Sequence, residues 1–330
     1  MPTLSIAEAQ ALVVRTLVRC RTSEVNAASV ARALVGAEAD GLKGHGLSRL
    51  PSYAAQAKVG KVRGEVSPVV TRPRPGIVAV DAGHGFAYPA LDSAAAALPE
   101  AARANGIAAA PIRRSHHCGA AGHPVERLAE GGLVALLFAN TPAAIAPWGG
   151  SRPVFGTNPI AFACPLPEAA PIVVDLSLSK VARGNILAAK QRGEAIPEGW
   201  AFDEAGRPTT SPDAALKGTM APLGDAKGTA LALMVELLAA GLTGSTYATD
   251  ATSFLDDKGG PPGTGQLLIA LDPDALGGPG GLTRFAALAS AITDQPGTRL
   301  PGARRLENRA KAARHGLVVA DGLLEEIEAV

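Results

Sequence analysis

The segment from Asp40 to Arg49 carries the side chains best suited to acid–base chemistry, and it directly follows a predicted helix. Its glycines permit close backbone approach, and loop positions favour functional residues. His45, with an ordinary pKa of about 6.5, can give or take a proton near neutral pH, and Arg49 can hold a carboxylate through two parallel hydrogen bonds. The segment therefore predicts proton transfer on a carboxylate-bearing substrate. The alternative is a surface histidine with a solvated arginine.

A second segment, Arg114–His123, follows a predicted strand and opens a helix that runs to Glu130. The free N–H groups and the positive dipole end of a helix N-terminus attract anions. Gly119 and Gly122 would let a pyrophosphate approach the backbone. We therefore expect a phosphate-binding turn here. The alternative is a tight strand-to-helix turn with an incidental pair of histidines.

The same segment also offers four potential zinc ligands, which are His116, His117, Cys118 and His123. Adjacent histidines point in different directions, however, and no second ligand cluster of suitable spacing follows. We therefore expect no metal at this turn.

The usual sequence motif of a dinucleotide-binding Rossmann domain is missing. Gly83-His84-Gly85 lacks the third glycine of Gly-x-Gly-x-x-Gly, and the glycines of Gly259–Gly265 precede no predicted helix. The sequence also contains no Walker lysine motif and no Gly-x-Ser-x-Gly nucleophile elbow. A standard Rossmann site is therefore not expected.

Composition and charge exclude several classes of protein. The chain has 330 residues, of which 47% are hydrophobic and 18% charged, as in globular proteins and unlike disordered or fibrous ones. The 31 Lys and Arg residues exceed the 30 Asp and Glu residues by one, so the net charge is +1. This charge provides no field for nucleic acid or for an acidic membrane, and we expect neither as a partner.

The sequence favours a cytoplasmic protein. Its three cysteines are widely spaced and form no Cys-x-x-Cys pair, which favours reduced thiols; they are Cys20, Cys118 and Cys164. Ser5 and Glu8 have the spacing of a helix capping box, so we expect the chain to begin with a helix and not with a signal peptide. The longest apolar stretch, Thr229–Leu242, contains Glu236 and is shorter than the roughly 20 residues that span a bilayer.

Hydrophobic spacing predicts helices near both ends of the chain and short buried strands between them. Two helices are expected before Gly41, and a basic terminal helix within Arg299–His315. Loops are expected at Gly193–Pro212 and Asp256–Gly265, which are rich in Gly, Pro and charge. Strands are expected at Ile77–Asp81, Leu133–Asn140, Ile160–Cys164, Ile172–Asp175 and Gln266–Asp272, and further helices at Ala87–Ala104, His123–Glu130 and Thr229–Gly241.

Several stretches have an order and spacing that make a chance match improbable. They are Gly44–Tyr53, His116–Gly122, Asn140–Ala143 with Pro147–Gly150, and Gly156–Ala161, supported by Asp175–Gly184, Lys227–Gly244 and Arg299–Arg305. Over nearly its whole length the chain resembles the type 2 malate/L-lactate dehydrogenase family. That family also contains sulfolactate dehydrogenases and the Δ1-piperideine-2-carboxylate/Δ1-pyrroline-2-carboxylate reductases.

The resemblance implies an α/β (mixed α+β) fold with a non-Rossmann, largely antiparallel sheet flanked by helices, usually as a homodimer. We expect residues 1–75 and 285–330 to form a helical dimerisation lobe. Residues 76–284 would form a sheet-containing lobe that binds cofactor and substrate. A non-Rossmann site would explain the missing glycine motif.

The resemblance also implies roles for individual residues. By position, His45 is the catalytic acid or base and Arg49 the clamp on the substrate carboxylate, with Thr157, Arg183 and Gly184 as further substrate contacts. The implied cofactor contacts are His117, Cys118, Gly119, Ala120, Ala121, Asp175, Leu176, Ser177, Lys227, Arg299, Gly302, Arg304 and Arg305. No metal is implied.

The implied activity is NAD(P)H-dependent hydride transfer to the α-carbon of a 2-imino or 2-oxo acid. The stretch Gly263–Ala270 is more similar to the cyclic-imine reductases than to the malate or lactate enzymes. We therefore expect a reductase of Δ1-piperideine-2-carboxylate or Δ1-pyrroline-2-carboxylate. NADPH is expected rather than NADH because arginines that could meet a 2′-phosphate are abundant near the C-terminus.

Two positions depart from the imine reductases. Those that resemble this chain commonly carry Ser before the catalytic His and Asp after the Arg-Gly pair, where this chain has Gly44 and Asn185. Glycine offers no hydroxyl and asparagine cannot act as a carboxylate base. A malate- or lactate-type 2-hydroxyacid dehydrogenase is therefore one alternative, and a non-catalytic nucleotide-binding homologue is another.

Overall fold

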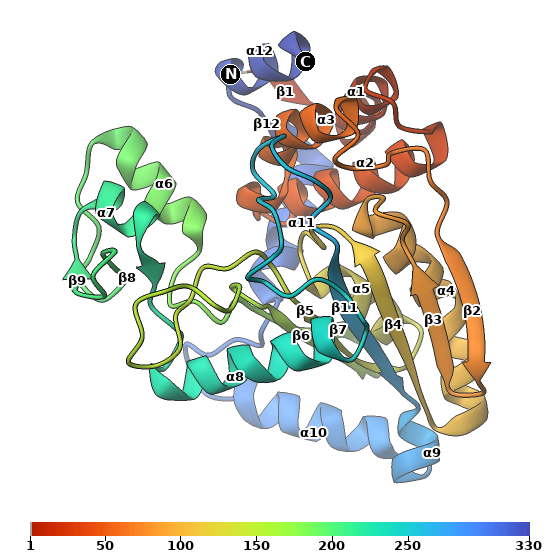
Figure 1. The fold of residues 1–330 in the computed structure, drawn as a ribbon. Helices are drawn as coiled ribbons and strands as arrows, with labels where there is room; N and C mark the ends of the chain where they lie inside the picture. The colour runs from red at the N-terminus through yellow and green to blue at the C-terminus, as the bar shows by residue number, and fades with distance from the viewer. Residues whose placement is uncertain (1) are drawn as a thin grey trace.

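A seven-stranded sheet forms the centre of the molecule in this computed structural model, which describes residues 2–330 (Figure 1). The strand order is β2-β3-β4-β11-β5-β6-β7, and every neighbouring pair is antiparallel except β3 and β4. The strands are β2 (Val69–Arg74), β3 (Ile77–Asp81), β4 (Ile107–Ser115), β5 (Val134–Ala139), β6 (Ile160–Leu166), β7 (Ala169–Leu176) and β11 (Thr264–Leu271). The expectation of a mixed, largely antiparallel sheet is confirmed.

Helices cover both faces of this sheet. One face is covered by α4 (Ala87–Asn105) and α5 (Gly122–Glu130), and the other by α8 (Ala226–Glu236) with the π-helical turn η3 (Leu237–Gly241). In the sequence, β11 is followed by two more helices, α9 (Pro273–Gly277) and α10 (Gly281–Thr293). On the central strand β11, Leu268 packs in the core under α4 and α5, whereas Leu267 packs in the core under α8. Successive side chains of a strand point to opposite faces of the sheet. Helices cover both faces, so both of these side chains are buried.

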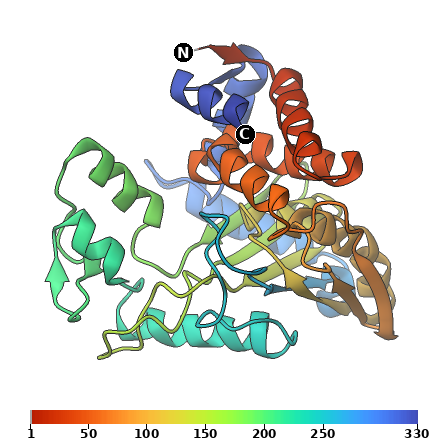
Figure 2. The same ribbon diagram turned by 45° about the horizontal axis from the view of Figure 1, so that its top comes forward.

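Helices from both ends of the chain form a third core beyond one end of the strands, as Figures 1 and 2 show. The elements are β1 (Thr3–Leu4), α1 (Ile6–Arg19), α2 (Glu24–Ala39), α3 (Leu50–Lys58), α11 (Ala303–His315), β12 (Leu317–Val318) and α12 (Asp321–Ala329). The predicted capping box of Ser5 and Glu8 is present at the start of α1. β1 pairs with β12, so the two ends of the chain lie side by side.

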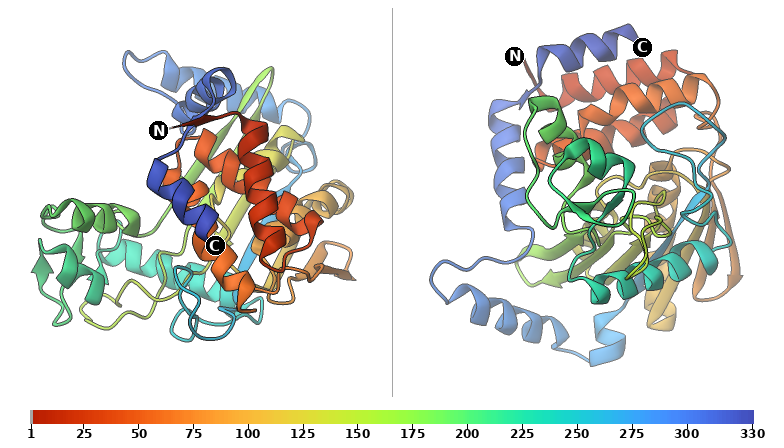
Figure 3. Two further views of the ribbon diagram at one scale, coloured as in Figure 1. Left: turned by 90° about the horizontal axis from the view of Figure 1, so that it is seen from above. Right: turned by 60° about the vertical axis from the view of Figure 1, so that its left-hand side comes forward.

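The prediction of a basic helix within Arg299–His315 is confirmed by α11, but this helix is not the last one of the chain. It begins at Ala303, after Gly302 with a φ of 89°, because this left-handed conformation lies outside the helical region. Helix α12 then follows it and is the last element of the chain. In the right-hand view of Figure 3, α11 lies at the left and descends from the other terminal helices toward the sheet.

The segment between β7 and α8 projects to one side of the sheet and is green in Figures 1 and 3. It contains α6 (Arg183–Arg192), β8 (Ala201–Phe202), β9 (Pro208–Thr209), α7 (Pro212–Lys217) and β10 (Thr219–Met220). The loop predicted over Gly193–Pro212 is therefore wrong in part, because β8 and β9 pair there in a small sheet with β10. Strands of two residues are too short to show a hydrophobic period.

The expected division into two lobes stays a prediction. Within residues 1–75, β2 pairs with β3 and belongs to the large sheet, not to the helical part. None of the helices described over residues 2–330 combines the length and apolar character needed to cross a bilayer.

Candidate active site

Two short 3-10 turns, η1 (Lys43–His45) and η2 (Leu47–Arg49), carry the predicted acid–base residue and the predicted carboxylate clamp. The buried carboxylate of Glu38, in the last turn of α2, accepts a hydrogen bond from the Leu47 backbone N–H at 3.0 Å. A Cβ atom at Gly46 would collide with this carboxylate, so only glycine fits between the two turns. Glu38 therefore fixes the shape of the loop.

His45 is largely withdrawn from solvent in this loop, and its Nδ1 is buried without a hydrogen-bond partner. Burial, together with the positive charges of Arg49 and His123, lowers the pKa of His45 to about 4. The imidazole is therefore neutral at pH 7 and has a nitrogen that could bond to a substrate. Arg49 Nε donates to the Gly44 carbonyl at 2.6 Å, which anchors the guanidinium to the same loop.

The two histidines that follow β4 pack against α3 and against His45. The ring of His117 stacks on that of His45, and its Nδ1 lies 2.6 Å from Tyr53 Oη. His116 Nε2 lies 2.9 Å from Gln56 Oε1. Burial lowers the pKa of His116 to about 3 and the pKa of His117 well below its ordinary value. No group of three or more His, Cys, Asp or Glu side chains that could hold a metal occurs in residues 2–330.

A loop before β11 covers these histidines. The ring centroid of Phe254 lies 5.0 Å from that of His116 and 5.1 Å from that of His117. The Phe254 carbonyl accepts a hydrogen bond from Gln56 Nε2 at 2.9 Å. Buried Lys61 donates to three further carbonyls of the loop, those of Ser253, Asp256 and Lys258. The loop is thereby fixed against the site although it contains neither helix nor strand.

The backbone of Thr157, a predicted substrate contact, is hydrogen-bonded through both its N–H and its carbonyl. Its N–H donates to Thr141 Oγ1 at 2.9 Å, and its carbonyl accepts from the Leu178 N–H at 2.8 Å. The carbonyl also lies 3.5 Å from the hydroxyl of Ser177, a predicted cofactor contact. Two predicted sets of contacts, substrate and cofactor, therefore meet at this residue.

A buried carboxylate, Glu236 of α8, holds the segment that carries Thr157. Its Oε2 accepts from Asn158 Nδ2 at 2.8 Å, and its Oε1 accepts from Asn140 Nδ2 at 3.0 Å and from the Ala248 N–H at 2.7 Å. Asn158 is fully buried and has a φ of 37°, a conformation that asparagine tolerates better than most residues. Glu236 thus joins four segments that are distant in sequence.

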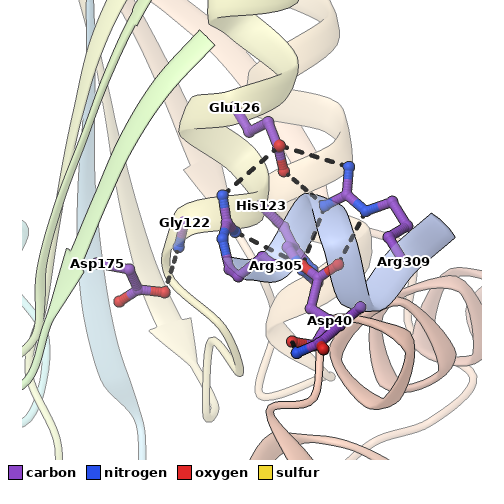
Figure 4. Close-up of polar contacts among 8 residues, drawn as sticks. Asp40, Gly122, His123, Glu126, Asp175, Arg305 and Arg309 are labelled. Carbon is purple, nitrogen blue, oxygen red and sulfur yellow. Dashed lines mark hydrogen bonds and ion pairs between the residues drawn. The ribbon is translucent and has the colours of Figure 1, made fainter. Parts of the chain in front are cut away.

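The predicted phosphate-binding turn leads to the start of α5, where α5 meets the end of β7 (Figure 4). The Gly122 N–H donates to Asp175 Oδ2 at 2.8 Å, and burial raises the pKa of Asp175. A Cβ at Gly122 would lie 3.1 Å from Arg305 Nη1, so the guanidinium reaches this helix end. Both terminal nitrogens of Arg305 are buried without a hydrogen-bond acceptor. Asp40 and Glu126 lie 3.6 Å from these nitrogens, so Arg305 is paired in charge but keeps N–H donors without an acceptor beside a helix N-terminus. Such donors fit an anion.

The structure brings only part of the predicted set together. His45 stacks on His117, which begins the predicted phosphate-binding turn. The end of this turn contacts Asp175 through the Gly122 N–H, and Arg305 lies beside Gly122. In contrast, no hydrogen bond, ion pair or ring contact among residues 2–330 joins five other predicted residues to the rest of the set; these are Arg183, Gly184, Lys227, Arg299 and Arg304. The roles of all these residues stay predictions.

Several side chains that fix the site were not predicted from the sequence. They are Glu38, Tyr53, Gln56, Lys61 and Glu236. Glu236 interrupts an apolar helical stretch, and Glu38 occupies a position in the apolar pattern of α2. A charged residue on a buried helix face needs a polar partner, so this interruption was the available signal.

The largely antiparallel sheet and the absence of the Rossmann glycine motif place the fold outside the Rossmann class. The chain matches the malate/L-lactate dehydrogenase family over residues 4–328 and belongs to that family. The recognition of the family from its motifs is therefore confirmed.

Curated relatives cover nearly the whole chain. The (2R)-3-sulfolactate dehydrogenase (NADP(+)) of Chromohalobacter salexigens is 50% identical over 326 residues, which are 99% of this chain and 97% of that protein. The Δ1-pyrroline-2-carboxylate/Δ1-piperideine-2-carboxylate reductase of Pseudomonas aeruginosa is 41% identical over 330 residues, 99% of this chain and 98% of that protein.

Solved structures give the same result. The Δ1-piperideine-2-carboxylate reductase of Pseudomonas syringae pathovar tomato superposes with a TM-score of 0.94 at 39% identity, covering 100% of this chain and 99% of that one. The sulfolactate dehydrogenase of Methanocaldococcus jannaschii has a TM-score of 0.90 at 27% identity, with coverage of 99% and 96%. The expectation of an oxidoreductase with a non-Rossmann fold is confirmed.

Proposed function

We propose that the protein is an NADPH-dependent reductase of cyclic 2-imino acids of the Δ1-pyrroline-2-carboxylate and Δ1-piperideine-2-carboxylate type. The observation that carries the proposal is the neutral His45 beside Arg49. A cyclic imine can arrive already protonated, so its reduction does not require a charged histidine. Relatives at 41% and 39% identity that are named for these substrates support the proposal.

The side chains of the loop bind and orient the substrate in this proposal. Bound NADPH supplies the hydride to the α-carbon. Arg49 holds the carboxylate, and its bond to the Gly44 carbonyl keeps the guanidinium in place, so that the reacting atoms stay close. Phe254, packed on His116 and His117, excludes water from one side of the site. His45 orients the imine nitrogen or exchanges a proton there.

The residues around α5 fit a phosphate-bearing cofactor. Arg305 has two buried nitrogens without acceptors, and the α5 N-terminus adds a positive dipole end. We propose that the turn His117–Ala121, the strand end Asp175–Ser177 and the start of α11 hold NADPH. The choice of NADPH over NADH is supported by the relative named for NADP(+). Arg183 and Gly184 are proposed for the substrate, and Lys227, Arg299 and Arg304 for the cofactor, on the family resemblance alone.

A 2-hydroxyacid dehydrogenase is the second candidate. The 50% identical relative is named a sulfolactate dehydrogenase, and Gly44 and Asn185 replace residues common in imine reductases. A histidine with a pKa of about 4 is neutral at pH 7 and can accept the proton of a substrate hydroxyl. This reading assigns His45 an obligatory role as base in oxidation and as proton donor in reduction.

The two candidates are separated by one panel of assays. NADPH and NADH oxidation are followed with Δ1-piperideine-2-carboxylate, Δ1-pyrroline-2-carboxylate, pyruvate, oxaloacetate and 3-sulfopyruvate, and NADP+ reduction with the corresponding hydroxy acids. The proposal expects turnover with the imines and a preference for NADPH. Turnover confined to 2-oxo acids would replace it by the second candidate. Nucleotide binding without turnover would make the chain a binding protein.

We also propose a homodimer in a reducing, cytoplasmic compartment. Helix α8 and the residues after it expose large apolar side chains, with exposed fractions between 40% and 67% at Leu231, Leu233, Leu237 and Leu242. Faces of this kind are typical of protein interfaces. The three cysteines are free and buried, which suits a reducing compartment. Light scattering after gel filtration tests the dimer, and a monomer at every concentration would contradict it.

A further inference from the structure

Asp40 lies at the junction between helix α2 and the loop that carries His45, and it is the central anion of a buried charged cluster (Figure 4). Its carboxylate, from which solvent is fully excluded, accepts from Arg309 Nε at 2.8 Å, from Arg309 Nη2 at 3.0 Å and from His123 Nε2 at 2.9 Å. Burial alone would raise the pKa of Asp40, but these hydrogen bonds outweigh it and hold the pKa below its ordinary value. Asp40 is therefore charged and fully engaged.

Helix α11 contacts Asp40 and Gly41, the first two residues of the loop. Asn308 Nδ2 donates to the Asp40 carbonyl at 3.0 Å. Gly41, with a φ of 81°, packs so closely on Asn308 that a Cβ atom would collide with that side chain. The neighbouring Arg309 forms the two-pronged contact with the Asp40 carboxylate. The start of the loop is thus fixed to α11 by both backbone and side chain.

The same helix begins with residues proposed to hold the cofactor. Gly302 precedes α11, and Arg305 in its first turn reaches toward Gly122 and Asp175. One terminal nitrogen of Arg305 also lies 3.6 Å from Asp40 Oδ2. Helix α11 therefore contacts the proposed cofactor site at its first turn and the His45 loop one turn later.

A second buried carboxylate, Glu126 of α5, provides a natural comparison. It lies 3.0 Å from Arg309 Nη2 and 3.6 Å from Arg305 Nη2, so it pairs with the same two arginines as Asp40. Glu126 and Asp40 are both buried, at 5% and 2% exposure. Only Asp40 leads directly into the His45 loop, whereas Glu126 belongs to a helix on the opposite side of Arg309.

We propose that Asp40 is a positioning residue that holds the His45 loop in register with the cofactor-binding end of α11. The inference rests on the proposed oxidoreductase function. The Leu42 N–H bonds to the Ala37 carbonyl and the His45 N–H bonds to the Leu42 carbonyl, so the five residues after Asp40 fold into one compact turn that ends at His45. A shift at Asp40 therefore displaces His45 relative to a cofactor held by α11, and displacements near 1 Å can cost about 100-fold in rate.

The test compares Asp40→Asn with Glu126→Gln in the full-length protein. Asparagine keeps one acceptor oxygen but loses the negative charge, and its amide nitrogen faces either Arg309, which can only donate, or His123. The contact that joins the loop to α11 is therefore weakened. We expect kcat at saturating NADPH and substrate to fall at least about tenfold, while the Kd for NADPH changes about twofold or less because Arg309 still pairs with Glu126. In Glu126→Gln, we expect kcat within about twofold of the unchanged protein.

An NMR titration of the His45 ring gives a readout that does not depend on turnover. Arg49, His117 and His123 face this imidazole, and its burial accounts for most of its low pKa. In Asp40→Asn we expect the pKa of His45 to rise toward its ordinary value because the loop is less buried, whereas Glu126→Gln should leave it near 4.

Three outcomes would overturn the inference: an unchanged kcat in Asp40→Asn, an equal loss of kcat in both variants, or an unchanged titration of His45 in Asp40→Asn. If Asp40→Asn does not fold, Asn308→Ala removes only the bond to the Asp40 carbonyl, and it must lower kcat and raise the pKa of His45 in the same direction. If the protein without any substitution turns over no imino or oxo acid, the proposed function is refuted. The titration would still decide whether Asp40 positions His45.

Discussion

The imidazole rings of His45 and His117 stack with centroids 5.3 Å apart and an angle of 27° between their planes. His117 is itself held by Tyr53, whose hydroxyl lies 2.6 Å from its Nδ1. The proposed acid or base is therefore packed against a side chain that cannot easily move. This arrangement defines the position of His45 before a substrate arrives, and burial lowers its pKa so that the ring is neutral at pH 7.

Replacing His45 separates the two proposed chemistries. In His45→Asn, we expect kcat/KM for 2-oxo acid reduction to fall by about 10²–10⁴, because no other group supplies the proton. Reduction of a protonated cyclic imine should fall much less. Steady-state assays with both substrates measure the difference, and His315→Asn, an exposed histidine at the end of α11, serves as control. Unaltered turnover of 2-oxo acids in His45→Asn would refute its role.

Replacing Arg49 tests the carboxylate clamp. Lysine keeps the charge but cannot form two parallel bonds to a carboxylate or the Nε bond to the Gly44 carbonyl. In Arg49→Lys we expect KM for the acid to rise about tenfold or more, while the Kd for NADPH is unchanged. Arg72→Lys, an exposed arginine paired with Glu100, should change neither constant. Equal effects on substrate and cofactor would argue against a clamp.

Acid should destabilise the protein before its carboxylates titrate. The folded-state pKa values of His45 and His116 are lowered to about 4 and about 3, so the unfolded chain takes up these protons first as pH falls below about 6.5. Their contribution to stability is complete above the unfolded pKa and is lost toward the folded pKa. Between these two pKa values, each histidine lowers the free energy of unfolding by up to about 1.4 kcal/mol for every unit by which the pH falls.

Urea unfolding at pH 7, 6 and 5 measures this loss of stability. His116→Gln should show a shallower decline between pH 6 and 5 than the unchanged protein, since one proton uptake is removed. A free energy of unfolding that stays constant or increases from pH 7 to pH 5 would contradict the burial of neutral histidines.

Serine should be accepted at position 44. A Cβ atom there meets nothing within 4 Å, so we expect Gly44→Ser to change the free energy of unfolding by about 0.5 kcal/mol or less. The new hydroxyl beside His45 should raise imine turnover. Gly46→Ser is the matched comparison, because its Cβ collides with Glu38, and it should cost about 2 kcal/mol or more. Equal stability of the two variants, measured in urea, would contradict the loop geometry.

Local patterns predicted every strand of the large sheet except β2, because continuous apolar runs are a local signal, and helical spacing likewise predicted α1, α2, α4, α5 and α8. Every residue of strand β2 is exposed, and the strand has no such run. His45 and Arg49 were also recognisable, since only three residues of one loop separate them. Contacts such as that of Asp40 with Arg309 join positions far apart in the sequence and leave no local pattern. The pairing of β1 with β12 was hidden for the same reason. In the sequence, Glu236 is visible only as a charged residue within an apolar helix. The three groups that donate hydrogen bonds to it come from other segments and could not be predicted.

The central claim is hydride transfer to the α-carbon of a carboxylic acid held at His45 and Arg49. Its most direct test uses NADPH deuterated at C4 of the nicotinamide, with Δ1-piperideine-2-carboxylate as substrate and mass spectrometry of the product. We expect one deuterium at the α-carbon of the cyclic amino acid when one face of the nicotinamide is labelled, and none when the other face is labelled. A product without deuterium from either labelled face, or no product from any imino or oxo acid, would contradict it.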